Sequence, residues 1–368
     1  MRILHLTDSM SNTANGINNV VVDLATAQAA AGHDVTVSSA GGDYHPLLHR
    51  HGVSTRVVDF SRRTARTLPA TISRLRGVVR DTDPDVVHVH TLTPAVLLPL
   101  AARRVPSVAT VHNEYQRGVA VMALADVVVC VSRANELEVT RRWPVRGRTT
   151  TIHNAVLGSV RRPGDVVPVE LARPAVVALG SVTRRKGSDL LVGAFGRVAE
   201  RHPDAHLYFV GNVDDPGTLT ARDGQAWADR VHTVGSVADP RPWLAGADVA
   251  VMASRQEPFG LVVVEEREAG LACIVSSSDG LPEVVDGGEA GLVVPREDVD
   301  ALARALGDVL SDESLRRDLQ RRASANLDRF RVSRMSDDYL AVYRRAAAGR
   351  GARRTRRVAR TGADADAR

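Results

Sequence analysis

Asp126-Val127-Val128-Val129-Cys130-Val131 is a short apolar run in which polar and apolar side chains do not alternate. A strand with two apolar faces has to be covered on both sides, as strands are in parallel sheets that carry helices on each face. Similar runs recur at residues 3–7, 35–39, 85–90 and 107–112, and helix-like segments follow them. This alternation predicts an α/β fold with a doubly wound parallel sheet.

A second series of apolar runs begins after residues 161–174, a stretch rich in proline and arginine that is typical of an interdomain linker. The strands expected in this series are residues 175–180, 205–211, 230–235, 247–253 and 272–276. A chain of 368 residues also exceeds the size at which a single core usually stops growing. We therefore expect two Rossmann-like domains, at residues 1–160 and 175–330.

The C-terminal part shows helical spacing without intervening strands, at residues 298–311, 315–330 and 334–348. We expect residues 331–348 to form a closing helix that packs back on the N-terminal domain. Residues 349–368 contain seven arginines and two aspartates, which accounts for the whole formal charge of +5, and are expected to form a disordered tail. Because the folded body then has no net charge, nucleic-acid binding is disfavoured.

The sequence also favours a cytoplasmic protein without a metal site. No apolar run approaches the roughly 20 residues of a membrane-spanning helix, and the first residues lack the pattern of a signal peptide. Cys130 and Cys273 adjoin apolar runs and are expected to be buried thiols. His88 and His90 share one face of an expected strand, but neither has carboxylate or cysteine neighbours, so we interpret both as structural.

The segment Glu257-Pro258-Phe259-Gly260-Leu261-Val262-Val263-Val264-Glu265 follows an expected buried strand and leads into a helix. Gly260 permits close approach of the backbone to a ligand, and the free amides of Leu261 and Val262 at the helix start suit an anionic phosphate. Glu265 is placed to accept hydrogen bonds from ribose hydroxyls, and Glu257 from a sugar. The alternative is that the acidic residues only cap and solvate the helix start.

Two further residues lie at expected carboxyl ends of strands in the first domain. His112 ends the run 107–112, at the edge of the sheet where α/β proteins bind ligands. Gly16, in Asn15-Gly16-Ile17, begins a helix after the first strand, where glycine and exposed amides meet a phosphate or a sugar. A structural histidine and a simple loop glycine are the alternatives.

The segment 257–265 resembles the hallmark of the retaining glycosyltransferases of family four, in which seven residues separate two glutamates. Further similarities occur in the order of that family, at His153-Asn154-Ala155, at Gly180-Ser181-Val182-Thr183-Arg184-Arg185-Lys186-Gly187 and at Gly280-Leu281-Pro282-Glu283. On these motifs the chain is similar to the superfamily of glycogen synthases and phosphatidylinositol mannosyltransferases.

The resemblance implies a GT-B fold, in which two Rossmann-like domains face each other across a cleft and C-terminal helices close the structure. It implies transfer of a sugar from a nucleoside diphosphate donor to an acceptor hydroxyl with retained configuration, in glycoconjugate, polysaccharide or natural-product biosynthesis. The first domain then holds a sugar, lipid-linked or small-molecule acceptor, and the second holds the donor. No cofactor or metal is expected, because Arg185 and Lys186 would neutralise the donor diphosphate.

The resemblance also assigns site residues. His112 contacts the transferring sugar, and His112, Glu257 and Lys186 are the catalytic candidates. Gly235 and Val237 lie under the nucleobase. The implied donor-binding residues are Gly16, Arg185, Lys186, Gly235, Val237, Glu257, Phe259, Gly260, Leu261, Val262 and Glu265. Family members usually have an arginine where this chain has Ser181, and Arg184, Arg185 or Lys186 would replace it.

The sequence is also compatible with other functions. A GT-B nucleotide-sugar epimerase, a sugar phosphorylase and a non-catalytic nucleotide-sugar-binding subunit would share the same motifs. A dehydrogenase is disfavoured, because no Gly-x-Gly-x-x-Gly follows the strand at residues 4–7 or at 176–180.

A basic amphipathic segment, Arg62 to Arg80, contains no acidic residue. Its apolar residues recur at helical spacing, with arginines largely opposite. Such a helix suits a peripheral contact with an anionic membrane, at the inner face for a cytoplasmic protein, or a solvated surface helix packed through its apolar stripe.

Overall fold

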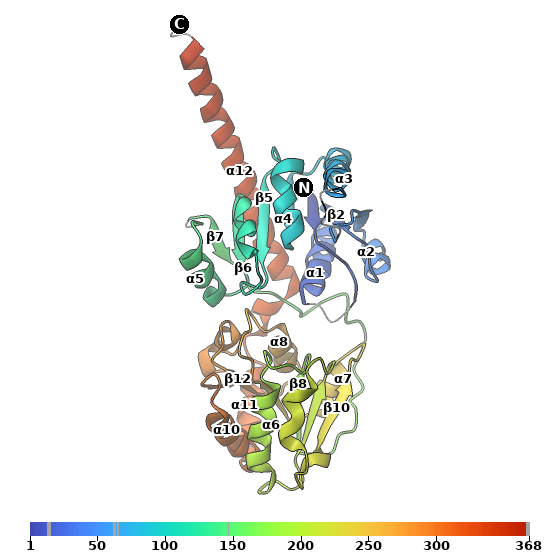
Figure 1. The fold of residues 1–368 in the computed structure, drawn as a ribbon, viewed down its shortest axis with the longest axis vertical. Helices are drawn as coiled ribbons and strands as arrows, with labels where there is room; N and C mark the ends of the chain where they lie inside the picture. Colours follow the sequence, from blue (N-terminus) through green and yellow to red (C-terminus); the bar gives the residue numbers. More distant parts are fainter. Residues whose placement is uncertain (13–15, 62–63, 65, 146, 366–368) are drawn as a thin grey trace. The chain divides into compact units, whose positions relative to one another are not determined.

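The structure is a computed structural model that describes residues 1–12, 16–61, 64, 66–145 and 147–365, with side chains up to residue 349. The chain folds into two compact units (Figure 1). The first comprises residues 1–131, 135–154 and 332–368, and the second comprises residues 132–134 and 155–331.

The first unit contains a parallel sheet of seven strands in the described residues, in the order β3-β2-β1-β4-β5-β6-β7. The chain winds outward from β1 in one direction and then returns to add β4 on the other side, so the strand order reverses between β1 and β4. The strands are β1 (Arg2–Leu6), β2 (Asp34–Ser39), β3 (Ser54–Val57), β4 (Val86–Val89), β5 (Ser107–Val111), β6 (Val127–Cys130) and β7 (Thr149–Thr151).

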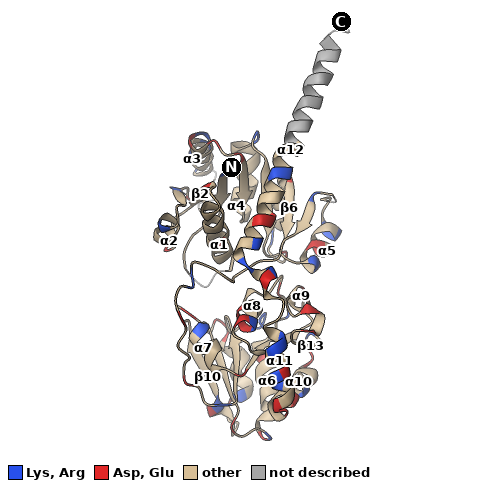
Figure 2. Cartoon of the chain, turned by 180° about the vertical axis from the view of Figure 1, so that it is seen from behind, with Lys and Arg blue, Asp and Glu red and all other residues tan. Residues whose placement is uncertain are grey.

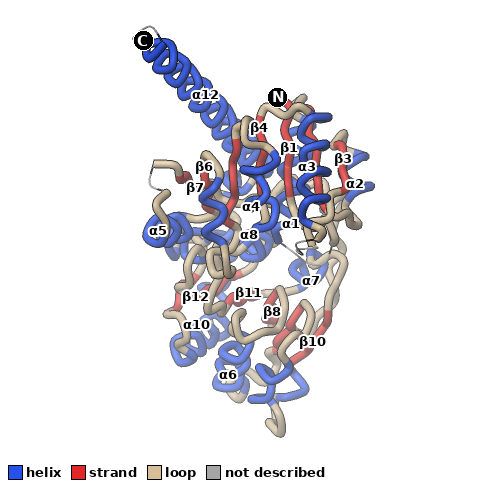
Figure 3. The backbone as a smooth tube through the Cα atoms, turned by 45° about the horizontal axis from the view of Figure 1, so that its top comes forward, coloured by secondary structure: helices blue, strands red, loops and turns tan. Residues whose placement is uncertain are grey.

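Helices cover both faces of this sheet (Figure 3). They are α1 (Gly16–Ala30), α2 (His45–Arg50), α3 (Leu68–Thr82), α4 (Leu92–Ala101), the 3-10 helix η1 (Val119–Leu124), α5 (Arg133–Arg142) and α12 (Val332–Ala365). On one face, α12 packs on α1, β4 and β5, and buries Tyr339 and Tyr343 completely.

The second unit repeats the same winding with six parallel strands in the order β10-β9-β8-β11-β12-β13, so its strand order reverses between β8 and β11. The strands are β8 (Ala175–Leu179), β9 (His206–Val210), β10 (Val231–Gly235), β11 (Val249–Met252), β12 (Ala272–Ser276) and β13 (Leu292–Val294). The helices are α6 (Ser188–Ala199), α7 (Arg241–Gly246), α8 (Leu261–Glu268), α9 (Leu281–Val284), α10 (Val299–Ser311) and α11 (Glu313–Ala323), with 3-10 turns η2 (Pro216–Arg222), η3 (Ala228–Arg230), η4 (Asp286–Gly288) and η5 (Leu327–Phe330).

These sheets confirm the expected pair of Rossmann-like, doubly wound parallel units, and every strand expected from an apolar run is present. Three short strands, β3, β7 and β13, escaped sequence reasoning, because each has at most four residues and lies at an edge of its sheet. Cys130 and Cys273 are buried free thiols, as expected. In the described residues no helix is both long and apolar enough to cross a bilayer.

The C-terminal helices differ from the expectation in two places. The single helix expected at 315–330 is divided into α11 and η5, because Asn326 adopts a left-handed conformation with φ of 54°. Where a disordered tail was expected from residue 349, α12 continues to Ala365. Alanine and arginine, which are strong helix formers, make up much of this extension.

The segment expected to be a linker, residues 161–174, is bound to the second unit. The guanidinium of Arg241 donates hydrogen bonds to the carbonyls of Arg162, Pro163 and Gly164 at 3.0–3.2 Å. The amide of Val169 donates to the Pro242 carbonyl at 2.9 Å. These bonds satisfy backbone groups of a segment that has no helix or strand of its own.

Basic and acidic residues are interspersed along α6, α10 and α11 (Figure 2). Several form ion pairs, such as Arg197 with Asp300 at 2.6 Å. This mixture agrees with a folded body that has no net charge.

Candidate functional site

The candidate site lies at the carboxyl edge of the second sheet, where β8 and β11 are neighbours. The chain leaves β8 toward β9 on one side and leaves β11 toward β12 on the other, so the strand order reverses between β8 and β11. Open α/β sheets bind ligands at such a reversal of strand order. The loop 180–187 after β8 and the loop 253–260 after β11 carry the sequence-predicted cations and the predicted glutamate.

An ion pair joins these two loops. Lys186 Nζ lies 2.5 Å from Glu257 Oε2, and the two side chains are only 17% and 14% exposed. Arg185 lies beside them, with its guanidinium 3.9 Å from the same carboxylate and donating to the Gln256 carbonyl at 2.9 Å. The Glu257 amide donates to Asp279 Oδ2 at 2.8 Å, which fixes the backbone of the second loop. The structure thus brings Glu257 together with the predicted cations Arg185 and Lys186, although Lys186 and Glu257 are 71 residues apart in sequence.

The start of α8 completes this group. Gly260 has φ of +102°, and a Cβ atom there would lie 2.7 Å from Leu281 Cδ2, so the sharp turn into the helix requires glycine. The backbone amides of Leu261 and Val262 in the first turn of α8 have no acceptor among the described residues. Unpaired amides at the positive end of a helix form an anion-binding site when a ligand is present.

The remaining predicted residues of the second unit differ in their surroundings. The Phe259 ring is 3% exposed and packs edge-on against Phe330, so its side chain anchors the loop in the core. Glu265 lies one turn into α8 and is partly exposed. Gly235 and Val237 lie at and after the end of β10, two strands away from the basic loop at the same edge of the sheet.

Arg255 is a residue of this site that sequence reasoning missed. Its guanidinium donates to both oxygens of Asp189 at 2.7 and 2.9 Å, to Glu297 at 2.7 Å and to the Arg184 carbonyl at 2.6 Å. Its amide donates to the Arg185 carbonyl at 2.8 Å. Arg255 therefore holds the basic loop against the loop after β11, and motif spacing gives no sign of these long-range bonds.

Ser181, which stands where family members usually have an arginine, lies in the same loop as Lys186. Ser181 lines a small hollow together with Gly180, Lys186 and Ser188. Arg184, one of the candidate replacements, is 75% exposed and lies 3.8 Å from Asp189. Lys186 and Arg185 are thus the cations closest to Glu257 among the three candidates.

In the first unit, His112 directly follows β5 and is partly buried. Its Nε2 lies 3.2 Å from Nδ1 of His90. Burial lowers the pKa of the His112 imidazole to about 3, so the ring is neutral at physiological pH. Gly16 is exposed at the first position of α1, and its predicted neighbour Asn15 lies outside the described residues.

Two family models match the chain. The model described as "Glycosyltransferase Family 4" matches residues 14–156, and the model described as "Glycosyl transferases group 1" matches residues 173–312. A glycogen synthase of Mycobacterium tuberculosis is 30% identical over 363 residues, which cover 84% of this chain and 85% of the relative. A phosphatidyl-myo-inositol mannosyltransferase of Mycolicibacterium smegmatis is 27% identical over 93% of both chains.

Solved structures show the same fold. The Anabaena protein HepE in complex with UDP superimposes with a TM-score of 0.77 at 19% identity, over 93% of this chain and 99% of that chain. The sucrose-phosphate synthase of Thermosynechococcus elongatus has a TM-score of 0.77 at 22% identity, over 95% and 100% of the two chains.

The helix α8 also contains a buried carboxyl group that the sequence did not reveal. Glu266, next to Glu265, is 0% exposed, and neither of its carboxyl oxygens has a hydrogen-bond partner among the described residues. Burial raises the pKa of the Glu266 carboxyl well above its usual range, and the charge of Glu265 adds to this shift. The neutral, protonated form of Glu266 is therefore the stable one in the folded protein.

We predict that Glu266→Gln stabilises the protein increasingly as pH rises. Above the unfolded-state pKa of about 4.3, the unfolded chain releases the proton that folded Glu266 keeps, so wild-type stability falls by up to about 1.4 kcal/mol per pH unit until the folded pKa is reached. Glutamine has no proton to lose. Urea unfolding of both proteins between about pH 5 and 8 measures the difference.

Glu200→Gln, the same change at an exposed position, is the matched control. A stability difference between Glu266→Gln and wild type that stays constant over this pH range would contradict a protonated Glu266.

Proposed function

The chain belongs to glycosyltransferase family 4 and has the GT-B fold, and from this we propose that it transfers a sugar from a nucleoside diphosphate donor to an acceptor hydroxyl with retention of anomeric configuration. The observation that carries the proposal is the Lys186–Glu257 ion pair beside the unpaired amides of Leu261 and Val262. We place the donor diphosphate at these amides. The complexes of HepE with UDP, with UDP and glucose, and with UDP-glucose support this class of donor.

The proposed reaction depends on separating charge. As the bond from the anomeric carbon to the diphosphate breaks, negative charge grows on the leaving group and positive charge grows on the sugar ring. Lys186, Arg185 and the start of α8 stabilise the leaving group through charges that are already in position. These groups take the place of a metal ion, so we propose that the reaction needs no cofactor.

Glu257 has a separate part in this proposal. Lys186 holds its carboxylate and Asp279 accepts a hydrogen bond from its backbone amide, so the free lone pairs of the carboxylate are positioned to accept hydrogen bonds from sugar hydroxyls. Glu265 has the corresponding part for the ribose, with Gly235 and Val237 next to the base. We assign His112 to the transferring sugar, because its neutral ring, at the end of β5, can bind a hydroxyl without adding charge.

We predict that Lys186→Ala and Glu257→Gln each lower kcat/KM by about a hundredfold or more, because each removes a preorganised electrostatic contact. Transfer is measured with a panel of nucleotide sugars and with sugar, lipid-linked and small-molecule acceptors, by release of nucleoside diphosphate and by the anomeric configuration of the product. Arg197→Ala, which removes an exposed cation of α6 that pairs with Asp300, is the matched control.

Four results would contradict the proposal. Wild-type activity in a folded double variant of Lys186 and Glu257 would show that these residues do not form the active site. A product with inverted anomeric configuration would exclude a retaining reaction. Donor binding without release of nucleoside diphosphate would indicate a binding subunit, and turnover without an acceptor would indicate an epimerase or a hydrolytic side reaction.

For the acceptor side, we propose that α3 contacts an anionic membrane surface, as suits a lipid-linked acceptor at the inner face of a membrane. Leu75 is buried in the core of the first unit, and Ile72 and Val79 pack against that core. The side chains of Arg66, Arg74 and Arg80 are exposed. Arg62 and Arg63, at the start of the basic segment, lie outside the described residues.

We predict that the protein floats with anionic vesicles, and that replacing Arg66, Arg74 and Arg80 with alanine abolishes flotation, since each basic residue near such a surface contributes about 1 kcal/mol. Neutral vesicles are the control for apolar binding. Equal flotation of the variant and wild type would show that α3 is a solvated surface helix.

A further inference from the structure

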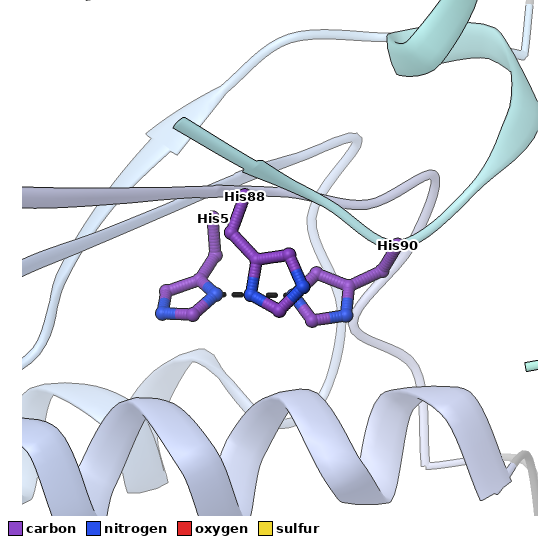
Figure 4. A group of neighbouring side chains, drawn as sticks. All are labelled: His5, His88 and His90. Atoms are coloured by element: carbon purple, nitrogen blue, oxygen red, sulfur yellow. Dashed lines mark hydrogen bonds between the residues drawn. The ribbon is translucent and has the colours of Figure 1, made fainter. Parts of the chain in front are cut away.

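Four histidines gather at the reversal of strand order in the first sheet. His5 lies on β1, His88 on β4, His90 just after β4 and His112 just after β5. His5, His88 and His90 are at most 2% exposed. Figure 4 shows the rings of these three residues on one side of the strands, with the His5–His90 hydrogen bond dashed.

The histidines form a chain of hydrogen bonds that ends at a glutamine. Gln28 of α1 places Oε1 2.8 Å from His5 Nε2. His5 Nδ1 lies 3.0 Å from His90 Nε2, and His90 Nδ1 lies 3.2 Å from His112 Nε2. The chain thus runs from a buried helix side chain to the candidate catalytic histidine, entirely within the first unit.

The imidazole rings in this chain of hydrogen bonds are neutral. Burial lowers the pKa of His5 to about 4 and that of His112 to about 3, and burial together with the neighbouring histidines lowers the pKa of His90 well below its usual range. A neutral imidazole has one nitrogen that donates and one that accepts. Each hydrogen bond between two rings therefore contains one proton. The proton positions on His5, His90 and His112 consequently depend on one another.

Gln28 sets the direction of the chain. Its Oε1 can only accept, so His5 carries its proton on Nε2 and accepts at Nδ1. His90 then donates from Nε2 to His5 and accepts at Nδ1, and His112 donates from Nε2 to His90. The outcome at the end of the chain is a His112 ring whose Nδ1 has no proton and no partner among the described residues.

A second branch agrees with this orientation of Gln28. The Gln28 amide nitrogen donates to the Tyr343 hydroxyl at 3.3 Å, and that hydroxyl donates to His88 Nδ1 at 2.7 Å. His88 Nε2 then donates to the Thr110 hydroxyl at 2.7 Å. Turning the Gln28 amide by 180° would reverse both branches and place the His112 proton on Nδ1, so the two orientations are distinguishable at His112.

A metal site is the other chemistry that these rings suggest. One ligand atom from each of His5, His88 and His90 lies within 4.8 Å of the others. However, both ring nitrogens of all three residues already have hydrogen-bond partners. Metal binding would break these bonds, whereas the hydrogen-bonded chain leaves no buried ring nitrogen unpaired.

We propose that Gln28, His5 and His90 are positioning residues that hold His112 in its Nε2–H form and so keep His112 Nδ1 as a hydrogen-bond acceptor for a hydroxyl of the transferring sugar. The sugar contact rests on the proposed function, whereas the proton position does not. In the reversed form, His112 would present a protonated Nδ1, which is a donor, to that hydroxyl instead of an acceptor.

The test uses the full-length protein labelled with ¹⁵N-histidine. Two-dimensional ¹H–¹⁵N spectra distinguish a protonated ring nitrogen from a bare one, and single-histidine variants assign the signals. We expect Nε2–H for His5, His90 and His112 in the wild type. Gln28→Leu removes the terminal acceptor and should yield a mixture of both forms at His112, whereas Gln28→Glu retains an acceptor and should keep Nε2–H.

Measurements of kcat then distinguish a positioning role of Gln28 from a merely structural one. In Gln28→Leu, kcat should fall in proportion to the fraction of His112 found as Nδ1–H, and Gln28→Glu should recover it. Thr26→Val, which removes buried hydrogen bonds of α1 outside the histidine network, is the matched control and should leave the His112 form and kcat unchanged. A stability loss alone would not change the form of His112.

Three results would overturn the proposal. These are an Nδ1–H or mixed His112 in the wild type, a Gln28→Leu variant that loses kcat while His112 stays Nε2–H, and stoichiometric Zn²⁺ binding that shifts the His5 and His90 signals. If the wild type transferred no sugar at all, the proposed function would fail, and the spectra would still decide whether Gln28 sets the form of His112.

Discussion

The ion pair between Lys186 and Glu257 ties the loop after β8 to the loop after β11, and the proposed chemistry depends on it. Both charges are mostly buried, a second cation, Arg185, lies 3.9 Å from the Glu257 carboxylate, and bonds made by Asp279 and Arg255 fix the backbones of the two loops. The pair also holds the glutamate next to the positive end of α8. One contact thus positions both the glutamate that we propose binds the sugar and the cations that we propose receive the departing phosphate.

The same topological rule organises both units, with different chemistry. Each sheet reverses its strand order between its first and fourth strands, and polar side chains gather at that reversal. In the second unit they are cations with a glutamate, which suits a charged donor. In the first unit they are neutral histidines linked through hydrogen bonds to Gln28, which suits recognition of hydroxyls. Both ring nitrogens of the buried His5, His88 and His90 are paired, and the network fixes the direction in which His112 donates.

The sequence predicted the features that depend on local pattern. Apolar runs located the long central strands, and the spacing of Glu257 and Glu265 located the site helix, because burial on both faces and the turn at Gly260 leave a mark in consecutive residues. It did not predict the contacts that depend on strand order. His5 and His90 are 85 residues apart, and Arg255 and Asp189 are 66 apart, so no spacing rule connects them. The burial of Glu266 was not predicted for a related reason, because it depends on how α8 packs.

The most direct test of the central claim is a crystal structure of the protein soaked with a nucleoside diphosphate sugar. We expect phosphate oxygens about 2.7–3.2 Å from the amides of Leu261 and Val262 and from Lys186 Nζ, with a sugar hydroxyl at Glu257. A nucleotide bound elsewhere, with the start of α8 empty and Lys186 still paired to Glu257 alone, would contradict it.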